Sequence, residues 1–215
     1  MARSLTSMRM SYERDTLGDT EVDRDPFEQF SHWFDEAIDN GPGEANAMMV
    51  STVGPDGQPS SRVVLMKAFG PDGFDFYTNY DSQKGQEIEA HPQVAALFYW
   101  PSLQRQVRIT GVARKLTPEQ SDAYFRSRPR GSQIGAIVSP QSEVVPDRAW
   151  LEAHFARAER DLEGRETLDR PDHWGGFRIV PQTIEFWQGR PNRLHDRIRY
   201  ERAAHGNWEI HRLAP

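Results

Sequence analysis

Cysteine is absent from this sequence of 215 residues, which excludes disulfide bonds and thiolate chemistry. No apolar run reaches the roughly 18 residues that a membrane-spanning helix needs. Residues 1–15, MARSLTSMRMSYERD, lack the apolar stretch of a signal peptide. We therefore expect a soluble, cytoplasmic protein.

Several binding and catalytic signatures are also missing. There is no Walker A loop and no Gly-x-Gly-x-x-Gly fingerprint, so nucleotide binding of these types is unsupported. HExxH and the Gly-x-Ser-x-Gly elbow are absent, so hydrolytic chemistry has no candidate. His205 and His211 flank a predicted hairpin, but two histidines do not define a metal site, and we expect none. A formal net charge of −6 argues against general nucleic-acid binding.

The chain opens with a polar stretch and then changes to helical periodicity. Residues 1–24 show little periodicity and predict a mobile N-terminal arm. Asp25 can cap a helix, Pro26 suits its first position, and Gly41 ends it. The apolar stripe of this helix consists of Phe27, Phe30, Phe34, Ala37 and Ile38.

Strand patterns follow in close succession. Residues 47–53, 60–69 and 74–79 are separated by two GPDG turns, at 54–57 and 70–73, whose Pro and Gly fit type I turns. The repeated turn predicts a three-strand meander. After a short predicted helix over 82–91, two more strands are expected over 94–100 and 105–116.

The second half mixes helices with strands. Thr117 and Gln120 form a capping box before DAYFRSR, and Pro146-Asp147 opens a further helix. Residues 176–189 predict a strand, a break and a second strand. Residues 198–215 predict a closing hairpin with its turn near 205–207.

The order of these elements favours a mainly β fold. Consecutive strands at hairpin spacing do not match the regular alternation of a parallel βαβ sheet. An antiparallel barrel with peripheral helices fits better, because closing the sheet removes exposed strand edges. We predict that residues 25–215 form a single domain and that residues 1–24 form the arm.

Residues 192–200, NRLHDRIRY, concentrate positive charge in an acidic chain. If they form a strand, one face carries Arg193, His195, Arg197 and Arg199, and Asp196 points the other way. An anionic ligand would offset the repulsion among these side chains. A subunit interface rich in Asp and Glu is the alternative.

Other basic residues also suggest bound phosphate. Arg62 and Lys67 are an odd number of residues apart in one predicted strand, so they would face opposite sides and serve different groups. Lys84 lies near a helix N-terminus, where a phosphate would relieve its clash with the helix dipole. The alternatives are arginine and lysine side chains that extend into solvent.

Tyr124, Arg128 and Ser132 form a second candidate phosphate site. Tyr124 and Arg128 share a helix face, and Arg can bind phosphate through two hydrogen bonds. A solvated, arginine-rich helix end is the alternative. Gln106, Gln141 and Ser142 could bind the edge of a ring, although alone they are uninformative. Trp174 and Trp187 fit core positions better than stacking against a ligand.

A series of segments then occurs in the order of a known family: SRVVLMK, FYTN, SQK, the RQV strand, YFRSRPRGSQIGA, QS, WGGFR, IEFWQG, RLHDR and RLAP. On these residues the sequence closely resembles the pyridoxamine 5′-phosphate oxidase family of flavin enzymes, from Arg9 to Pro215. The resemblance implies an antiparallel, Greek-key split β-barrel. It also implies a homodimer that binds FMN at its interface, with both subunits contributing to each site.

The resemblance assigns residues to the site. Arg62 and Lys84 would hold the FMN phosphate. The other cofactor-binding positions would be Val63, Val64, Leu65, Met66, Lys67, Tyr77, Thr78, Gln83, Gln106, Gln141, Ser142, Trp187 and Arg197. The substrate phosphate would be held by Lys67, Tyr124, Arg128 and Ser132. The remaining substrate-binding positions would be Arg9, Tyr12, Arg193, Leu194 and His195, with Arg193 and His195 as the catalytic pair.

The implied reaction is the oxidation of pyridoxamine or pyridoxine 5′-phosphate to pyridoxal 5′-phosphate. A hydride would pass from C4′ to flavin N5, and dioxygen would be reduced to hydrogen peroxide. One departure is Gln83, which stands where many members carry arginine. The alternatives are a flavin oxidase of the phenazine-pathway type and a non-catalytic flavin- or pyridoxal-phosphate-binding module. The candidate phosphate site argues against the first, and the intact RLHDR segment argues against the second.

Overall fold

The structure is a computed structural model that describes residues 11–18, 21–40 and 43–215. Its internal contacts divide the chain into two compact units. Unit 1 contains Met1–Met49, Ala96–Thr110 and Pro181–Pro215, and unit 2 contains Val50–Ala95 and Gly111–Val180. Each unit is described by itself below.

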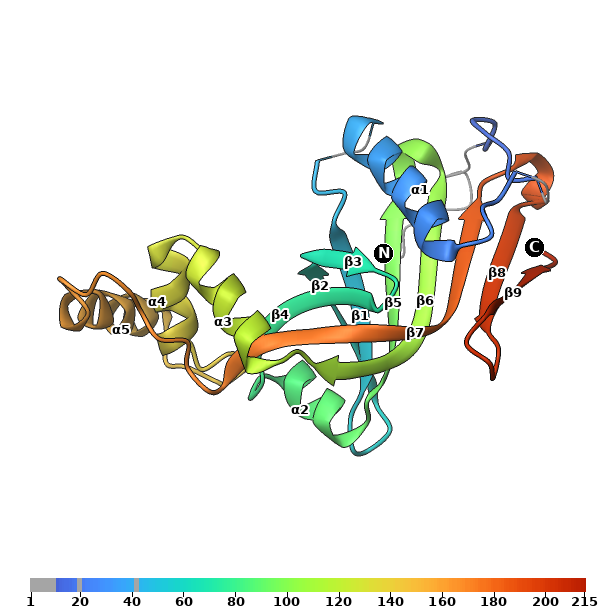
Figure 1. Cartoon of the computed structure of the whole chain (residues 1–215). Helices are drawn as coiled ribbons and strands as arrows, with labels where there is room; N and C mark the ends of the chain where they lie inside the picture. The colour runs from blue at the N-terminus through green and yellow to red at the C-terminus, as the bar shows by residue number, and fades with distance from the viewer. Residues whose placement is uncertain (1–10, 19–20, 41–42) are drawn as a thin grey trace. The chain divides into compact units, whose positions relative to one another are not determined.

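The described residues form one antiparallel sheet system with accompanying helices (Figure 1). The strands are β1 Ala47–Val53, β2 Pro59–Leu65, β3 Ala68–Gly70, β4 Gly73–Asn79, β5 Gln93–Trp100, β6 Arg105–Lys115, β7 Trp174–Gln188, β8 Asp196–Arg202 and β9 Trp208–Arg212. The helices are α1 Pro26–Asn40, α2 Gln83–Ala90, α3 Pro118–Ser127, α4 Arg130–Val138 and α5 Arg148–Asp161. Short 3₁₀ turns are η1 Pro101–Leu103 and η2 Pro191–Arg193.

The strand order is β2-β1-β5-β6-β7-β4-β3, and β8 and β9 continue from β7. β2 and β3 stand at opposite ends of this order, yet only Met66 and Lys67 separate them along the chain. A sheet that curls back on itself, as in a barrel, satisfies both facts.

Helix α1 of unit 1 forms as the sequence predicts. The Asp25 side chain accepts a hydrogen bond of 2.8 Å from the backbone N–H of Phe27, and Pro26 is the first helical residue. The buried face contains Phe27, Phe30, Trp33 and Ala37. The expected apolar stripe is wrong at its end, because Ile38 is 58% exposed while Trp33 is buried.

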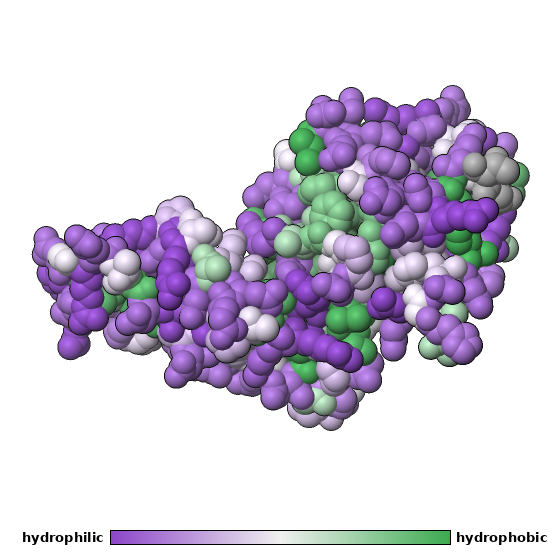
Figure 2. All heavy atoms as spheres, viewed as in Figure 1, coloured by the Kyte–Doolittle hydropathy of each residue, from purple (hydrophilic) through white to green (hydrophobic). Residues whose placement is uncertain are grey.

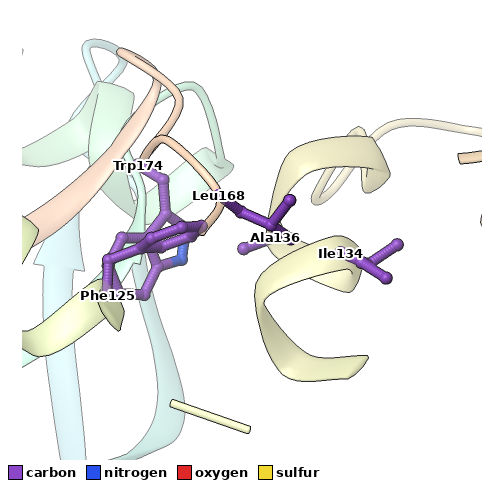
Figure 3. Close-up of a cluster of buried hydrophobic side chains, with 5 residues drawn as sticks. All are labelled: Phe125, Ile134, Ala136, Leu168 and Trp174. Atoms are coloured by element: carbon purple, nitrogen blue, oxygen red, sulfur yellow. The ribbon is translucent and has the colours of Figure 1, made fainter. Parts of the chain in front are cut away.

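Unit 2 has its own small core beside β4 and β7. Phe125 and Trp174 lie together in Figure 3, and Leu168 lies next to Ala136 of α4. Ile134 belongs to the same cluster of buried residues. Helix α5 has no buried residue, and hydrophilic residues dominate the face of α4 and α5 in Figure 2. Partly buried side chains of α5, Phe155 and Ala158, also pack against the cluster, which therefore connects α4 and α5 to the end of β7.

The structure corrects the predicted meander. The predicted strand over 60–69 is interrupted at Met66 and Lys67, where the Lys67 N–H donates to the Asp75 carbonyl at 2.8 Å. β2 pairs with β1, whereas β4 pairs with β3 and β7, so β2 and β4 are not neighbours in the strand order. Both GPDG turns are present, but the second joins the short β3 to β4.

The predicted break in residues 176–189 is also wrong, because β7 is continuous. β4 pairs with Trp174–Ile179, and β8 pairs with Thr183–Gln188. Pro181 lies between these two ladders, so its missing N–H removes no hydrogen bond from either. Helix α4 was not predicted. The capping box before α3 and the β8–β9 hairpin agree with prediction.

The described residues 11–18 and 21–24 belong to unit 1. Leu17 is buried there, and the Tyr200 hydroxyl donates to the Asp23 carbonyl at 2.5 Å. The mobility of the arm over 1–24 and the single domain over 25–215 stay predictions. No helix among the described residues is long and apolar enough to cross a membrane.

Candidate active site

Arg62 of β2 lies in a polar cluster of unit 2. Its guanidinium donates to Ser60 and Thr52 and lies 3.2 Å from the carboxylate of Glu87 on α2. Glu87 also accepts from Thr52, Ser60 and Gln83. Burial alone would raise the pKa of Glu87, but these hydrogen bonds and the charge of Arg62 lower it to about 2. Glu87 is therefore ionised and fixes the guanidinium of Arg62.

Lys84 lies in the first turn of α2, one turn from Glu87. Its Nζ donates to Gln141 Oε1 at 2.8 Å and to Thr78 Oγ1 at 3.0 Å. Burial and the charge of Arg62 lower the pKa of Lys84 to about 8, although Glu87 opposes the shift. Two cations that disfavour one another beside a helix N-terminus would be stabilised by a dianion such as phosphate. The residues present therefore fit the phosphate of a nucleotide cofactor.

Aromatic rings line a second part of unit 2. Tyr77 and Tyr124 are stacked with centroids 3.9 Å apart, and Tyr77 is stacked on Trp174 at 5.6 Å. The Arg128 guanidinium lies 4.5 Å from the centroid of the Trp174 ring. Burial lowers the pKa of Arg128, and its Nη1 is buried with no hydrogen-bond partner among the described residues. A buried, unpaired cationic donor calls for an anionic ligand.

A cavity of about 280 Å³ adjoins this arginine. Its lining consists of Asn79, Arg128, Ser132, Gly135, Ala136, Ser139, Gln141 and Trp174. Gln141 also accepts a hydrogen bond from Lys84, so one side chain of the lining contacts the group formed by Arg62, Lys84 and Glu87, called the Lys84 cluster below. The volume is near the lower end of the range for small-molecule sites.

A third cluster lies in unit 1, around His195. The His195 ring lies 4.6 Å from Trp187 and 5.8 Å from Tyr12, centroid to centroid. Its Nδ1 accepts a hydrogen bond of 3.1 Å from the backbone N–H of Arg190. Burial and then Arg193 lower the pKa of His195, with Asp196 opposing. The neutral imidazole therefore carries its proton on Nε2.

The predicted strand face over 192–200 is only partly correct. β8 begins at Asp196, and Arg193 belongs to η2 with φ 63°, so Arg193 and His195 precede the strand. Only Arg197 and Arg199 share a strand face, and both pair with acids. Arg197 Nε lies 2.8 Å from Glu185, and Arg199 lies 3.0 Å from Glu201. Acidic neighbours from this same chain offset part of the repulsion that the sequence suggested.

The other predicted residues fall into both units. Unit 2 contains Val63, Val64, Leu65, Met66, Lys67, Tyr77, Thr78, Gln83, Tyr124, Ser132 and Ser142, besides the arginines and lysine above. Unit 1 contains Gln106, Trp187, Leu194 and Arg197 with Tyr12, Arg193 and His195. Met66 is buried, whereas Val63, Lys67 and Leu194 are exposed. Arg9 lies outside the described residues.

Sequence reasoning missed several polar residues. Glu87, Thr52 and Ser60 hold Arg62, and Glu185 holds Arg197. Trp174, which the sequence favours as a core residue, is 5% exposed and also belongs to the aromatic stack. The spacing of four between Gln83 and Glu87 was the available signal, because residues four apart share a helix face.

Family models match most of the chain. The model described as pyridoxamine 5′-phosphate oxidase matches residues 34–160, more than half of the sequence. The chain belongs to the pyridoxamine 5′-phosphate oxidase family. A second model, the pyridoxine 5′-phosphate oxidase C-terminal dimerisation region, matches residues 174–215. The predicted family is confirmed.

Full-length relatives agree with this family. The pyridoxine/pyridoxamine 5′-phosphate oxidase of Flavobacterium johnsoniae is 52% identical over 211 residues, covering 98% of each chain. The pyridoxine/pyridoxamine 5′-phosphate oxidase 1 of Ralstonia nicotianae is 51% identical over 216 residues, covering 99% of each chain. These oxidase relatives match both units of the present chain.

Solved structures show the same fold. PhzG from Burkholderia lata 383, in complex with tetrahydrophenazine-1-carboxylic acid, superposes with a TM-score of 0.85 at 29% identity, covering 94% of this chain and 98% of that one. A pyridoxamine 5′-phosphate oxidase-related, FMN binding protein from Nostoc punctiforme has a TM-score of 0.72 at 16% identity, covering 87% and 96%. The predicted antiparallel split-barrel fold is confirmed.

Proposed function

We propose that this chain is an FMN-dependent oxidase that converts pyridoxamine and pyridoxine 5′-phosphates to pyridoxal 5′-phosphate and reduces dioxygen to hydrogen peroxide. One observation carries the proposal. Relatives named pyridoxine/pyridoxamine 5′-phosphate oxidase are about half identical to this chain over nearly its whole length. A location in the cytoplasm stays a prediction.

The Lys84 cluster is suited to the FMN phosphate. Arg62 and Lys84 supply the charge, Glu87 fixes Arg62, and Thr78 and Gln141 fix Lys84. When bound, FMN supplies the acceptor for the hydride of the substrate and passes the electrons to dioxygen. The other proposed cofactor contacts are Val63–Met66, Lys67, Tyr77, Gln83, Gln106, Ser142, Trp187 and Arg197.

The cavity beside Arg128 is suited to the substrate phosphate. Arg128 offers a buried Nη1 without a partner, Ser132 lines the same cavity, and Tyr124 stacks beside it. Lys67, exposed in the link from β2 to β3, is the fourth proposed contact. A charge-assisted pair in this half-buried setting fixes one end of the substrate and so orients its other end.

At the reacting end, His195 acts as a hydrogen-bond donor. Because Nδ1 accepts from Arg190, the neutral ring can donate only through Nε2. The guanidinium of Arg193 stabilises negative charge on the substrate and so assists proton loss from the 4′ group. Leu194, Tyr12 and Arg9 complete the proposed substrate contacts. If replacing both Arg193 and His195 with alanine left kcat/KM nearly unchanged, this assignment would be wrong.

We further propose a homodimer with both subunits contributing to each site. The dimerisation region over 174–215 contains Trp187, Arg193, His195 and Arg197. The proposed cofactor and substrate contacts of these residues therefore lie in the segment that matches the dimerisation region. Light scattering of the FMN-loaded protein should give twice the mass of 24.7 kDa.

The decisive test is spectroscopic. The purified protein should be yellow, and pyridoxine 5′-phosphate added without oxygen should bleach it. Air should then restore the colour with stoichiometric aldehyde and peroxide. A yellow protein that bleaches with neither the alcohol nor the amine substrate would refute the proposal and favour the phenazine-type or binding-module alternatives.

A further inference from the structure

The segment Tyr12–Thr16 is held mainly by polar contacts. Its residues are exposed except Tyr12, which is half-buried, so apolar burial fixes little of it. The Arg14 N–H donates to Gln104 Oε1 at 3.2 Å, and the Arg14 guanidinium donates to the Ser102 carbonyl at 2.6 Å. The Asp15 carboxylate lies 2.6 Å from Arg105. Removing a polar contact should therefore change where this segment lies.

Arg105 is the rigid member of these contacts. Its side chain is 4% exposed, it lies 4.4 Å from the centroid of the Trp33 ring, and its Nε donates to Gln188 at 2.7 Å. A guanidinium fixed by stacking and a buried amide loses little further freedom when it binds a carboxylate. Arg105 therefore offers Asp15 a preformed attachment point.

Asp15 is also connected to His195. The Asp15 carbonyl accepts a hydrogen bond of 2.9 Å from Arg190 Nη1, and the backbone N–H of Arg190 donates to His195 Nδ1. Gly189 precedes Arg190, and a Cβ there would lie 2.8 Å from Tyr12 Cγ. The segment and the loop before His195 are thus fitted to each other at Tyr12 and at Asp15.

We propose that Arg105 is a positioning residue for the substrate: through Asp15, it holds Tyr12 against His195 and Trp187. Arg105 itself does not touch the substrate. The proposal rests on the proposed function, in which Tyr12 and His195 are substrate contacts. Loss of the contact between Asp15 and Arg105 should weaken substrate binding. It should leave the Lys84 cluster intact, because no residue of that cluster contacts Asp15 or Arg105.

The chain contains a matched control. The same guanidinium lies 2.8 Å from Glu36 of α1, and the Asp15 and Glu36 side chains are 48% and 49% exposed. Asp15→Ala and Glu36→Ala each remove one half-exposed carboxylate from Arg105. Only Asp15 belongs to the segment that carries Tyr12, where its carboxylate also accepts from the Thr16 N–H at 2.8 Å. A difference between the variants therefore reports how this carboxylate holds the segment, beyond the loss of an ion pair with Arg105.

The experiment compares both variants with the FMN-loaded enzyme in two measurements. Asp15→Ala should raise KM for pyridoxine 5′-phosphate about fivefold with kcat within about twofold, as expected for one partly exposed pair. It should also speed hydrogen exchange at the amides of Arg14 and Leu17. Glu36→Ala should change neither quantity, and FMN content should stay equal in all three proteins.

Equal effects of the two variants, or unchanged exchange and KM in Asp15→Ala, would overturn the proposal. If the unsubstituted enzyme does not turn over this substrate, the proposed function fails. In that case the hydrogen-exchange rates of the two variants still decide whether Arg105 holds the segment Tyr12–Thr16.

Discussion

The carboxylate of Glu87 lies 3.2 Å from the guanidinium of Arg62, and both side chains are largely withdrawn from solvent. Glu87 reaches Arg62 from the helix that also carries Lys84. One helix therefore supplies a cation for the proposed cofactor phosphate and the anion that orients the second cation.

Glu87→Gln should weaken FMN binding. The amide keeps the shape of the side chain but loses the charge that holds Arg62. We expect the Kd for FMN to rise about tenfold, since a hydrogen bond to a charged group contributes at least ~1.4 kcal/mol. Quenching of FMN fluorescence during titration of FMN-free protein measures this. Glu89→Gln on the same helix is the control, because Glu89 is 69% exposed and pairs with Lys115.

FMN affinity should depend on pH through Lys84. Its pKa of about 8 in the free protein must rise when phosphate binds, so affinity should fall above about pH 8, by up to tenfold per pH unit. Lys84→Arg should bind FMN equally well from pH 7 to 9.5, because guanidinium stays protonated. A slope that persists in Lys84→Arg would assign the proton to another group.

The lowered pKa of Lys84 has the opposite effect on folding stability, which should rise with pH. Protonated Lys84 is less favourable in the FMN-free folded protein than in the unfolded chain, where its pKa is about 10.5. The free energy of unfolding of FMN-free protein should therefore gain a contribution from Lys84 as pH rises from about 8 to 10.5. Urea unfolding of the protein and of Lys84→Met across this range isolates that contribution.

Arg128→Ala should remove the preference for phosphorylated substrate. Losing a buried charge-assisted contact costs roughly 2–3 kcal/mol, so KM for pyridoxine 5′-phosphate should rise roughly 30- to 150-fold. Any turnover of pyridoxine, which lacks the phosphate, should be unchanged. Arg126→Ala, which replaces an exposed arginine in the last turn of α3, is the control. Parallel losses for both substrates would mean that Arg128 mainly packs against Trp174.

Gly189→Ala should act on Tyr12. The new methyl group would lie 2.8 Å from Tyr12 Cγ, so one of the two must move. Overpacking a rigid core costs about 1–3 kcal/mol, but Tyr12 lies on a surface segment and can yield. We expect a Tm within a few degrees of the original and a several-fold higher KM. Gly70→Ala, with no atom within 4 Å of the new Cβ, should change neither.

Local signals in the sequence predicted the elements well. Asp25 and Thr117 cap helices where expected, and the β8–β9 hairpin closes the chain. Such features depend on residues a few positions apart. The position of β4 between β7 and β3 depends on pairing across the whole chain, which the repeated GPDG turns could not reveal.

For the site, too, the sequence revealed local motifs but not contacts between residues far apart in the chain. Family motifs located Arg62, Lys84, Arg128 and His195, and the structure shows what surrounds each one. Glu87 and Arg105 escaped notice because their importance comes from contacts with residues far along the chain, such as Thr52 and Asp15. A carboxylate on a helix and an arginine in a strand have no distinguishing local pattern.

Arg193 adopts a left-handed backbone conformation with φ 63°, which favours glycine. Retaining arginine there means that the protein gives up some stability for the sake of the side chain. Arg193→Gly should have a free energy of unfolding about 1 kcal/mol greater than that of Arg193→Ala, with equally low kcat/KM. The turn before β8 is therefore a place where stability and the proposed activity compete, and a search for more stable variants would select against the proposed catalytic residue.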